Sequence, residues 1–174
     1  MRTTRVITAV ALAASAVLAG TSSATAGSTG ISSVRTATAS FHDVSAAVAA
    51  GWSIDLHDLN GIDCIASPQG GMGIHYVNGP LVGDGAIDAS TPEAVIYQPM
   101  ADGSLKLVAV EYVVLRADWD ATHAAPPSLF GQPFGLVLAG NRYGLPDFYE
   151  LHAWIWRNNP AGMFEDWNPK VTCP

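Results

Sequence analysis

Two apolar segments separated by a tight turn set the strongest limit on how this chain folds. Residues 94–99 (AVIYQP) and 105–115 (LKLVAVEYVVL) are rich in β-branched and aromatic residues, and MADGS joins them. Such segments joined by a short connection containing Asp and Gly are typical of an antiparallel hairpin. The chain is therefore expected to build a sheet around this hairpin.

Short strands are expected along most of the remaining chain. We predict strands at about 72–78 and 147–157, a weaker one within 134–140, and a helix that begins at Ser40 and ends at Gly51. Together these elements indicate an α+β domain, mainly an antiparallel β-sheet, curled or barrel-like, with one N-terminal helix.

The segment from 118 to 146 is expected to be a long irregular loop. It holds four prolines and four glycines and has little regular periodicity. Irregular connections of this length are uncommon in compact domains and often serve as lids or binding loops. The alternative is an ordered segment that wraps over the sheet.

The first 26 residues have the pattern of a secretory signal peptide. Arg2 and Arg5 precede the apolar run VITAVALAASAVLAG, and the small residues ATA predict cleavage after Ala26. This run is shorter than the roughly 20 residues that a membrane-spanning helix needs. We therefore expect a secreted, extracellular protein with no membrane attachment after cleavage. Residues 27–39 then have the composition of a flexible leader, and 40–174 form a single globular domain.

The acidic net charge excludes two classes of partner, nucleic acids and anionic lipid surfaces. Without the signal peptide the chain has six basic and fifteen acidic residues, a formal net charge of −9. Such a chain has no basic stripe for nucleic acid or for an anionic lipid surface. A small-molecule ligand is an expected partner, and the sequence leaves the oligomeric state open.

The chain has only two cysteines, Cys64 and Cys173. In an oxidising compartment an isolated pair is most simply a disulfide. The alternative, two metal-binding thiolates, is a poor metal signature at this separation. We predict a disulfide that ties the C-terminal tail to the start of the core.

Ionisable residues stand out on the apolar faces of three predicted strands. Because side chains alternate along a strand, Glu111 is the one polar residue on an otherwise apolar face of 105–115. Glu150 and His152 share a face of the last strand with two tryptophans, and His75 follows closely on two glycines. A buried carboxylate needs a cation, a metal or hydrogen-bond donors.

If these faces converge, His75, Glu111 and His152 form a two-histidine, one-carboxylate metal site. That ligand set suits a divalent metal with open positions, such as zinc, iron or manganese. Without a metal, His152 could act as a general base oriented by Glu111 or Glu150. Each residue could also be structural, with Glu111 paired to Arg142 or Arg157 in the core and the histidines hydrogen-bonded there.

Sulfur and aromatic residues offer further alternatives. Met72 and Met163 with a histidine would favour copper, whose reduced state prefers soft ligands; as structural residues they would fill gaps in the core. Ligand binding is also predicted for Met72, Tyr76, Trp154 and Trp156. The aromatic rings of Tyr76, Trp154, Trp156 and Trp167 could form a surface for a sugar ring or a hydrophobic molecule.

Four stretches carry a resemblance that covers most of the mature chain. They are GMGIHYVN (71–78), PEAVIYQP (92–99), LVAVEYVV (107–114) and LHAWIWRNNPAGMFEDWNPKVTC (151–173). Together they resemble a group of small secreted bacterial proteins of unknown function, and the C-terminal stretch is the most specific. The resemblance implies export and a disulfide-tied domain, and it implies no activity.

Two functions follow as expectations. The first is a secreted metal-binding protein or small-molecule enzyme whose pocket holds His75, Glu111 and His152. The second is a non-catalytic ligand-binding or interaction module with an aromatic surface. The residues alone leave open whether the chain is an enzyme.

Overall fold

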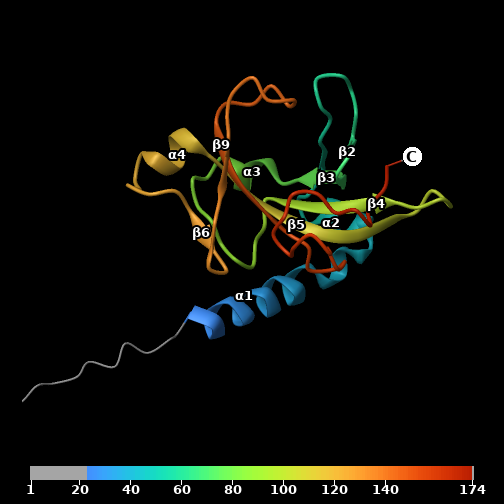
Figure 1. Cartoon of the computed structure of the whole chain (residues 1–174), viewed down its shortest axis with the longest axis horizontal. Helices are drawn as coiled ribbons and strands as arrows, with labels where there is room; N and C mark the ends of the chain where they lie inside the picture. The colour runs from blue at the N-terminus through green and yellow to red at the C-terminus, as the bar shows by residue number, and fades with distance from the viewer. Residues whose placement is uncertain (1–22, 174) are drawn as a thin grey trace, which may run out of the picture.

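A seven-stranded antiparallel sheet organises the protein, which has an α+β fold (Figure 1). The computed structural model describes residues 23–173. The strands lie in the order β1-β3-β4-β5-β9-β8, and β2 pairs with β3 beside β1. Their bounds are β1 Ile54–Asp55, β2 Cys64–Ser67, β3 Gly70–Val77, β4 Ala94–Pro99, β5 Leu105–Leu115, β8 Gly135–Val137 and β9 Phe148–Ala153.

The sheet is open, so the barrel-like closure expected from the sequence does not form among the described strands. Closure would require β8 to pair with β1 or β2. These three end strands have only three, two and four residues. Short end strands offer few unpaired backbone groups and so limit edge-to-edge pairing without closure.

The β4–β5 hairpin has the strand bounds that the sequence predicts. The amide of Met100 donates to the carbonyl of Ser104 at 2.8 Å, and the carboxylate of Asp102 accepts from the Ser104 amide and hydroxyl. Asp and Ser stabilise turns in this way because their short side chains reach nearby backbone groups.

A bulge in this hairpin changes which residues share a face. Ile96 pairs with Ala109 and Tyr97 with Leu107, so Val108 is an extra residue. Leu107 therefore packs in the core on the opposite side of the sheet from Ala109, and Val108 packs with Ala109. Strict alternation, which placed Leu107 with Glu111, is wrong at this end of β5.

Glycines in β3 allow neighbouring backbone to come close. A Cβ atom on Gly73 would lie 2.5 Å from the carbonyl oxygen of Tyr97, and Gly73 has a φ of +103°. A Cβ atom on Gly71 would lie 2.8 Å from the carbonyl oxygen of Val171, to which the Gly71 amide donates. These glycines therefore admit adjacent backbone into the sheet.

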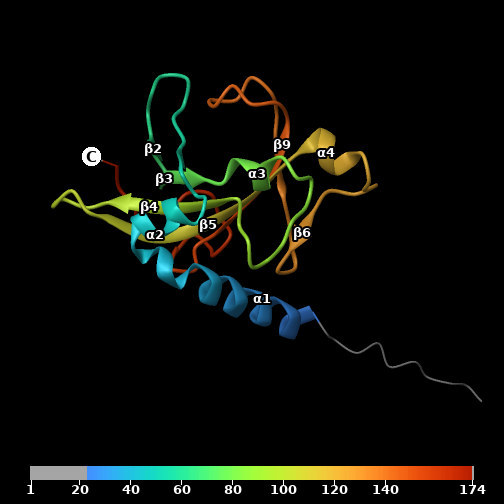
Figure 2. The same cartoon turned by 180° about the vertical axis from the view of Figure 1, so that it is seen from behind.

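Helices cover one face of the sheet. Figures 1 and 2 show α1 (Ser23–Thr38) along one side, while the segment before β2 and the segment before β9 rise on the other. After α1 come the 3-10 helix η1 (Ala39–His42) and α2 (Val44–Ala49). The predicted helix over 40–51 is thus divided in two, because Asp43, rather than Ser40, caps α2 by accepting from the Ser45 amide.

The flexible leader predicted over 27–39 is corrected by the structure, which places almost all of it in α1. Val34 and Thr38 of this helix are buried. Arg35 donates to the carbonyl of Ile155, and Trp156 donates to the hydroxyl of Thr38. The composition suggested a leader because Gly, Ser and Thr dominate, but packing against the sheet outweighs weak helix propensity. The predicted signal peptide lies largely outside the described residues.

The segment predicted as a long loop, 118–146, has more regular structure than expected. It contains the end of α4 (Arg116–Asp120), the two-stranded sheet β6 (Ser128–Leu129) and β7 (Gln132–Pro133), and β8. The remaining short helix, α3 (Gly79–Val82), follows β3 directly.

The last strand ends earlier than predicted, at Ala153 rather than near 157. Beyond it the amide of Trp154 donates to the carbonyl of Met163, and Asn168 forms a bridge with Gly71 of β3. The predicted disulfide between Cys64 and Cys173 is present. The C-terminal segment is therefore fixed against β2 and β3.

Candidate functional site

The register of the sheet places a glutamate and a histidine side by side. Glu111 on β5 is the direct partner of His152 on β9, so the two side chains leave one face of the sheet at neighbouring positions. On its other side Glu111 faces Ala94 of β4, which in turn faces Val77 of β3.

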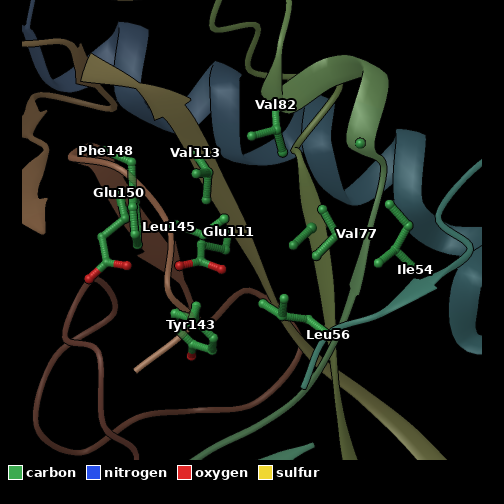
Figure 3. Close-up of a pocket in the computed structure, with 12 residues that line it drawn as sticks. Ile54, Leu56, Val77, Val82, Glu111, Val113, Tyr143, Leu145, Phe148 and Glu150 are labelled. Atoms are coloured by element: carbon green, nitrogen blue, oxygen red, sulfur yellow. The ribbon is translucent and has the colours of Figure 1, made fainter. Parts of the chain in front are cut away.

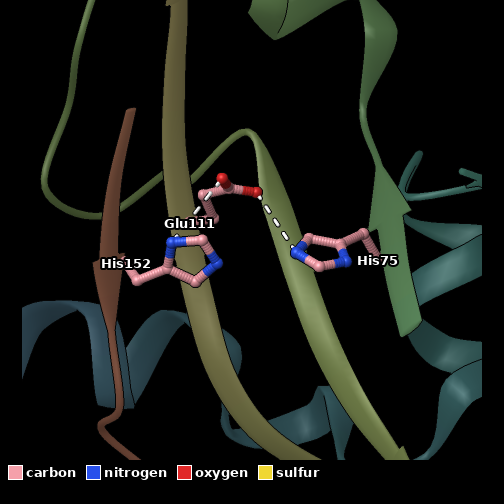
Figure 4. Close-up of side chains that lie close together, drawn as sticks. All are labelled: His75, Glu111 and His152. Atoms are coloured by element: carbon pink, nitrogen blue, oxygen red, sulfur yellow. Dashed lines mark ion pairs between the residues drawn. The ribbon is translucent and has the colours of Figure 1, made fainter. Parts of the chain in front are cut away.

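A second histidine reaches the same carboxylate from two strands away. His75 lies two residues before Val77 on β3 and therefore shares its face. His75 faces Ile96 of β4 and Glu111 faces Ala94, so the imidazole of His75 approaches Glu111 diagonally across β4, past the small side chain of Ala94. Figure 4 shows the three residues pointing toward one another from three strands.

The carboxylate of Glu111 lies between the two imidazole rings. Its Oε2 is 3.6 Å from Nε2 of His75, and its Oε1 is 3.8 Å from Nδ1 of His152. Ligand-type atoms of all three residues lie within 4.8 Å of one another. The rings themselves meet edge to face, with centroids 5.8 Å apart.

These separations fit a shared ion better than direct hydrogen bonds. An N–H···O hydrogen bond spans up to about 3.2 Å. Ligands about 2.0–2.1 Å from one tetrahedral zinc ion lie about 3.3 Å from each other. The separations of 3.6 and 3.8 Å are only slightly longer than that. A divalent ion could thus be accommodated by small side-chain movements.

The site is buried and holds polar atoms without partners. His75 and His152 are 1% and 0% exposed, and Glu111 is 6% exposed. Within the described part of the chain, Nδ1 of His75 and Nε2 of His152 have no hydrogen-bond partner, and Nδ1 of His152 has only the longer contacts with the carboxylates of Glu111 and Asp166. An unsatisfied buried nitrogen costs about 1–3 kcal/mol. Such atoms in a folded protein point to a bound ion, water or ligand.

The two histidines have opposite pKa shifts although both are buried. Burial lowers the pKa of His75 to about 4, despite the attraction of Glu111. Burial also acts to lower the pKa of His152, but the carboxylates of Glu111, Asp166 and Glu150 outweigh it and raise this pKa to about 9. In the metal-free protein at neutral pH, these pKa values make the imidazole of His75 neutral and that of His152 protonated.

Asp166 is a site residue that sequence reasoning missed. Its Oδ1 lies 3.5 Å from Nδ1 of His152, and this contact lowers the pKa of Asp166. A carboxylate beside an imidazole orients the ring and increases its basicity. No pattern in the sequence marks Asp166, because it belongs to a segment without regular structure and only the tertiary fold brings it to β9.

A cavity of about 270 Å³ lies on the same face of the sheet (Figure 3). Its polar lining consists of Glu111, Tyr143 and Glu150, which Figure 3 shows near one another. Glu111 thus belongs both to the cavity wall and to the histidine group. The apolar lining is Ile54, Leu56, Val77, Gly79, Val82, Ala94, Val113, Leu145 and Phe148.

Two connecting segments complete the cavity wall, one before β2 and one before β9. The first contributes Leu56, and the second contributes Tyr143. A backbone hydrogen bond of 2.9 Å from Leu59 to Arg142 joins the segments, and Arg142 forms a 3.0 Å ion pair with Asp58. The pairing of Asp58 with Arg142 was not predicted from the sequence, because 84 residues separate them.

Glu150, a predicted catalytic residue, lies on this wall beside Glu111. Burial and, to a smaller extent, the negative charge of Glu111 together raise the pKa of Glu150 to about 8. Of the three predicted catalytic residues, Glu111 and Glu150 line the cavity. His152 does not line it, but it is the direct neighbour of Glu111 on β9.

The four residues predicted to bind a ligand lie outside the lining of the 270 Å³ cavity. Met72 is buried on β3, and Tyr76 packs edge to face on Tyr97 toward the helices. Trp154 and Trp156 line a separate hollow of about 340 Å³. None of these four predicted residues lines the 270 Å³ cavity.

The alternative pairings of Glu111 with arginine are not formed. Arg142 pairs with Asp58, and Arg157 donates to the carbonyl of Lys170. The ion-pair partners of Glu111 among the described residues are the two histidines. A second acidic group with a histidine, formed by Asp55, His57 and Asp63, lies at the surface.

Chemically, the arrangement offers two imidazoles and one carboxylate to a divalent ion and leaves coordination positions open. Comparison of the chain with family models, curated proteins and solved structures finds no match. Over residues 23–173, no helix is long and apolar enough to cross a membrane.

Proposed function

We propose that this chain is an exported protein that holds a divalent metal ion with His75, Glu111 and His152 and binds a small molecule in the adjoining cavity. One observation carries the proposal. Three buried ionisable side chains from three strands approach within 4.8 Å of one another, and one of them also lines a largely apolar cavity. A pocket of this kind beside a metal is the usual arrangement of a small-molecule enzyme site.

The donor set supports zinc, iron or manganese more than copper. Imidazole and carboxylate ligands suit these ions, whereas reduced copper prefers sulfur. Met163, one of the two methionines considered for copper, is 41% exposed, and neither methionine lines the cavity. Binding the metal requires His152 to lose the proton that it carries at neutral pH, so affinity should rise with pH.

Export is supported by the signal-peptide pattern of residues 1–26 and by the disulfide. Disulfides persist in oxidising compartments and are rare in reducing ones. The resemblance to small secreted bacterial proteins points the same way.

A second candidate function is non-catalytic binding of a small molecule without metal. The cavity itself favours it, because nine of its twelve lining residues are apolar. In that case the His152 cation, held between Glu111 and Asp166, would be a structural ion pair. The tryptophans expected from the sequence to bind a ligand do not line this cavity; Trp154 and Trp156 line the separate hollow of about 340 Å³.

Metal analysis of protein purified without an affinity tag tests the first function. We expect about one divalent ion per wild-type chain, loss of that ion in His75→Ala and His152→Ala, and retention in His123→Ala. His123 is a suitable control because it is exposed and stacks on Trp119 away from the site. Equal metal content in wild type and His152→Ala would refute the assigned ligands.

A further inference from the structure

The hollow of about 340 Å³ lies apart from the metal site, where α1 contacts the segment that follows β9. Its lining includes Arg35 of α1 and, from that segment, Trp154, Trp156, Arg157, Asn159 and Met163. We propose that this hollow binds a small organic anion, whose carboxylate or phosphate group is held by Arg35 and Arg157 and whose apolar part lies against Trp156 and Met163. This second site depends neither on the metal ion nor on the 270 Å³ cavity.

The first argument is that both arginines of the hollow lack an ion pair. Within residues 23–173 the chain has four arginines, and the two outside the hollow, Arg116 and Arg142, are paired with aspartates. Neither Arg35 nor Arg157 forms an ion pair with any residue that the structure describes, and none of the acidic residues in this range lines the hollow. In an acidic protein, two guanidinium groups without a carboxylate partner attract an anion to the hollow.

The second argument is the set of hydrogen-bond donors that remain free. Arg35 donates through Nε to the carbonyl of Ile155, and Arg157 donates through one Nη nitrogen to the carbonyl of Lys170. Nε of Arg157 is buried and has no hydrogen-bond partner in the described part of the chain. A buried donor without a partner is rare in a folded protein and points to a bound water, ion or ligand. Because a guanidinium carries several N–H donors, both arginines can still donate to an acceptor.

A neutral sugar ring, the other ligand considered for the tryptophans, matches these free groups less well. The indole N–H groups of Trp154 and Trp156 already donate within the protein, and the side-chain amide of Asn159 is bonded to the backbone of its own loop. Apart from the exposed Asn158, the groups that remain are guanidinium donors. Sugar hydroxyls need both donors and acceptors, whereas an oxyanion accepts from guanidinium groups in pairs.

The apolar part of the ligand follows from the rest of the wall and from the size of the hollow. Trp156 is partly buried, and Met163 is 41% exposed. Both side chains make favourable contacts with an aromatic ring. A dry cavity of about 150 Å³ in another protein holds one benzene molecule. A hollow of about 340 Å³ therefore has room for one ring together with its oxyanion group.

Calorimetric titration with four probes tests the proposal: benzoate, phenyl phosphate, benzamide and acetate. We expect benzoate or phenyl phosphate, or both, to bind, and the comparison between them identifies the preferred oxyanion. Benzamide has the shape of benzoate without the charge and should bind about tenfold or more weakly than the tighter anion. No binding of either aromatic anion, or benzamide binding as tightly as the tighter one, would overturn the proposal. Acetate binding as tightly as benzoate would overturn the assigned apolar part.

Two pairs of variants locate the binding. Met163→Glu places a carboxylate on the wall and should weaken anion binding at least about tenfold, whereas Met100→Glu should not, because Met100 is similarly exposed (39%) and does not line the hollow. Arg35→Gln should also weaken binding, while Lys106→Gln removes the same charge from an exposed position outside the hollow and should leave binding unchanged. Circular dichroism shows whether each variant folds. Unchanged anion binding in folded Met163→Glu and Arg35→Gln proteins would overturn the proposal.

The titrations are run in the presence of a chelator, so that a metal ion at His75, Glu111 and His152 cannot bind the anion instead. Binding by the stripped protein that is weakened by Met163→Glu supports the second site whether or not the metal centre exists. Binding that needs the metal and is insensitive to Met163→Glu would place the anion at the metal centre and overturn the proposal.

Discussion

His75 and Glu111 meet across an intervening strand, with Nε2 of the imidazole 3.6 Å from Oε2 of the carboxylate. They belong to β3 and β5, which are not neighbours in the sheet. The residue of β4 that faces Glu111 is Ala94, which is fully buried. Because His75 itself faces Ile96, its imidazole reaches Glu111 diagonally across β4, past the small side chain of Ala94.

This relationship gives the first prediction. Ala94→Val should lower metal affinity at least about tenfold, because the two added methyl groups occupy the space over which His75 reaches Glu111. Overpacking of this kind also costs about 1–3 kcal/mol of stability. Ala153→Val is the matched control, since Ala153 is equally buried but packs in the core toward the helices. A folded Ala94→Val protein with wild-type metal affinity would contradict the account.

The second prediction concerns Glu93, whose buried carboxyl group lies immediately before the first residue of β4. Its Oε2 accepts from the amide of Val113 at 3.0 Å, while the carbonyl of Pro92 accepts from Trp52. Glu93 is 2% exposed, and burial raises its pKa to about 8.

Because the folded state binds the Glu93 proton more tightly than the unfolded state, the associated stability is present below pH 4.5 and declines as pH rises toward 8. Between pH 4.5 and 7 the loss is on the order of 3 kcal/mol. Glu93→Gln should remove this loss. The free energy of unfolding in urea, taken as the difference between variant and wild type, should therefore favour the variant more at pH 7 than at pH 5. The same pH dependence in variant and wild type would contradict it.

The third prediction concerns the disulfide. Cys64 and Cys173 are 109 residues apart, and a bridge closing a loop of this length contributes about 4–5 kcal/mol in the chain-entropy model. The double variant Cys64→Ser/Cys173→Ser should therefore melt about 10–20 °C lower. Mass spectrometry should find the natural protein two hydrogens lighter than its fully reduced form. Two free thiols in protein purified without reductant would refute the bridge.

The fourth prediction concerns the two segments that complete the cavity wall. Asp58→Ala removes the ion pair with Arg142 and also the hydrogen bonds that Asp58 accepts from the amides of Asn60 and Ile62. Amides in 56–63 and 138–147 should therefore exchange hydrogen faster, and those in 138–147 report on the lost ion pair. Asp88→Ala is the control, since Asp88 caps its own turn at Ser90 and lies outside the cavity. Equal exchange in these segments for Asp58→Ala and wild type would show that the ion pair does not hold them together.

Much of the sheet could be predicted from the sequence because its signals are local. Alternation and a turn segment give the β4–β5 hairpin with its observed bounds. Alternation also places Glu111, Glu150 and His152 on the faces that they occupy, since the β5–β9 register is regular there. The convergence with His75 could only be stated as a condition, because strand order is not encoded in any single segment.

What could not be predicted depends on contacts between distant segments. The bulge at Val108 reverses the faces at one end of β5, and no residue in that strand marks it. Asp166 and Tyr143 reach the site from segments whose conformation is set by packing. The helix α1 was missed for the same reason: Val34 and Thr38 are buried by the sheet and not by their neighbours in sequence.

The central claim is a metal ion bound between His75, Glu111 and His152, and the most direct test is a crystal structure of the zinc-loaded protein with anomalous diffraction measured at the zinc absorption edge. The account predicts an anomalous peak about 2.0–2.2 Å from a nitrogen of each histidine and from a carboxylate oxygen of Glu111. A peak at the surface group of Asp55, His57 and Asp63 with none at Glu111, or no peak at all, would contradict it.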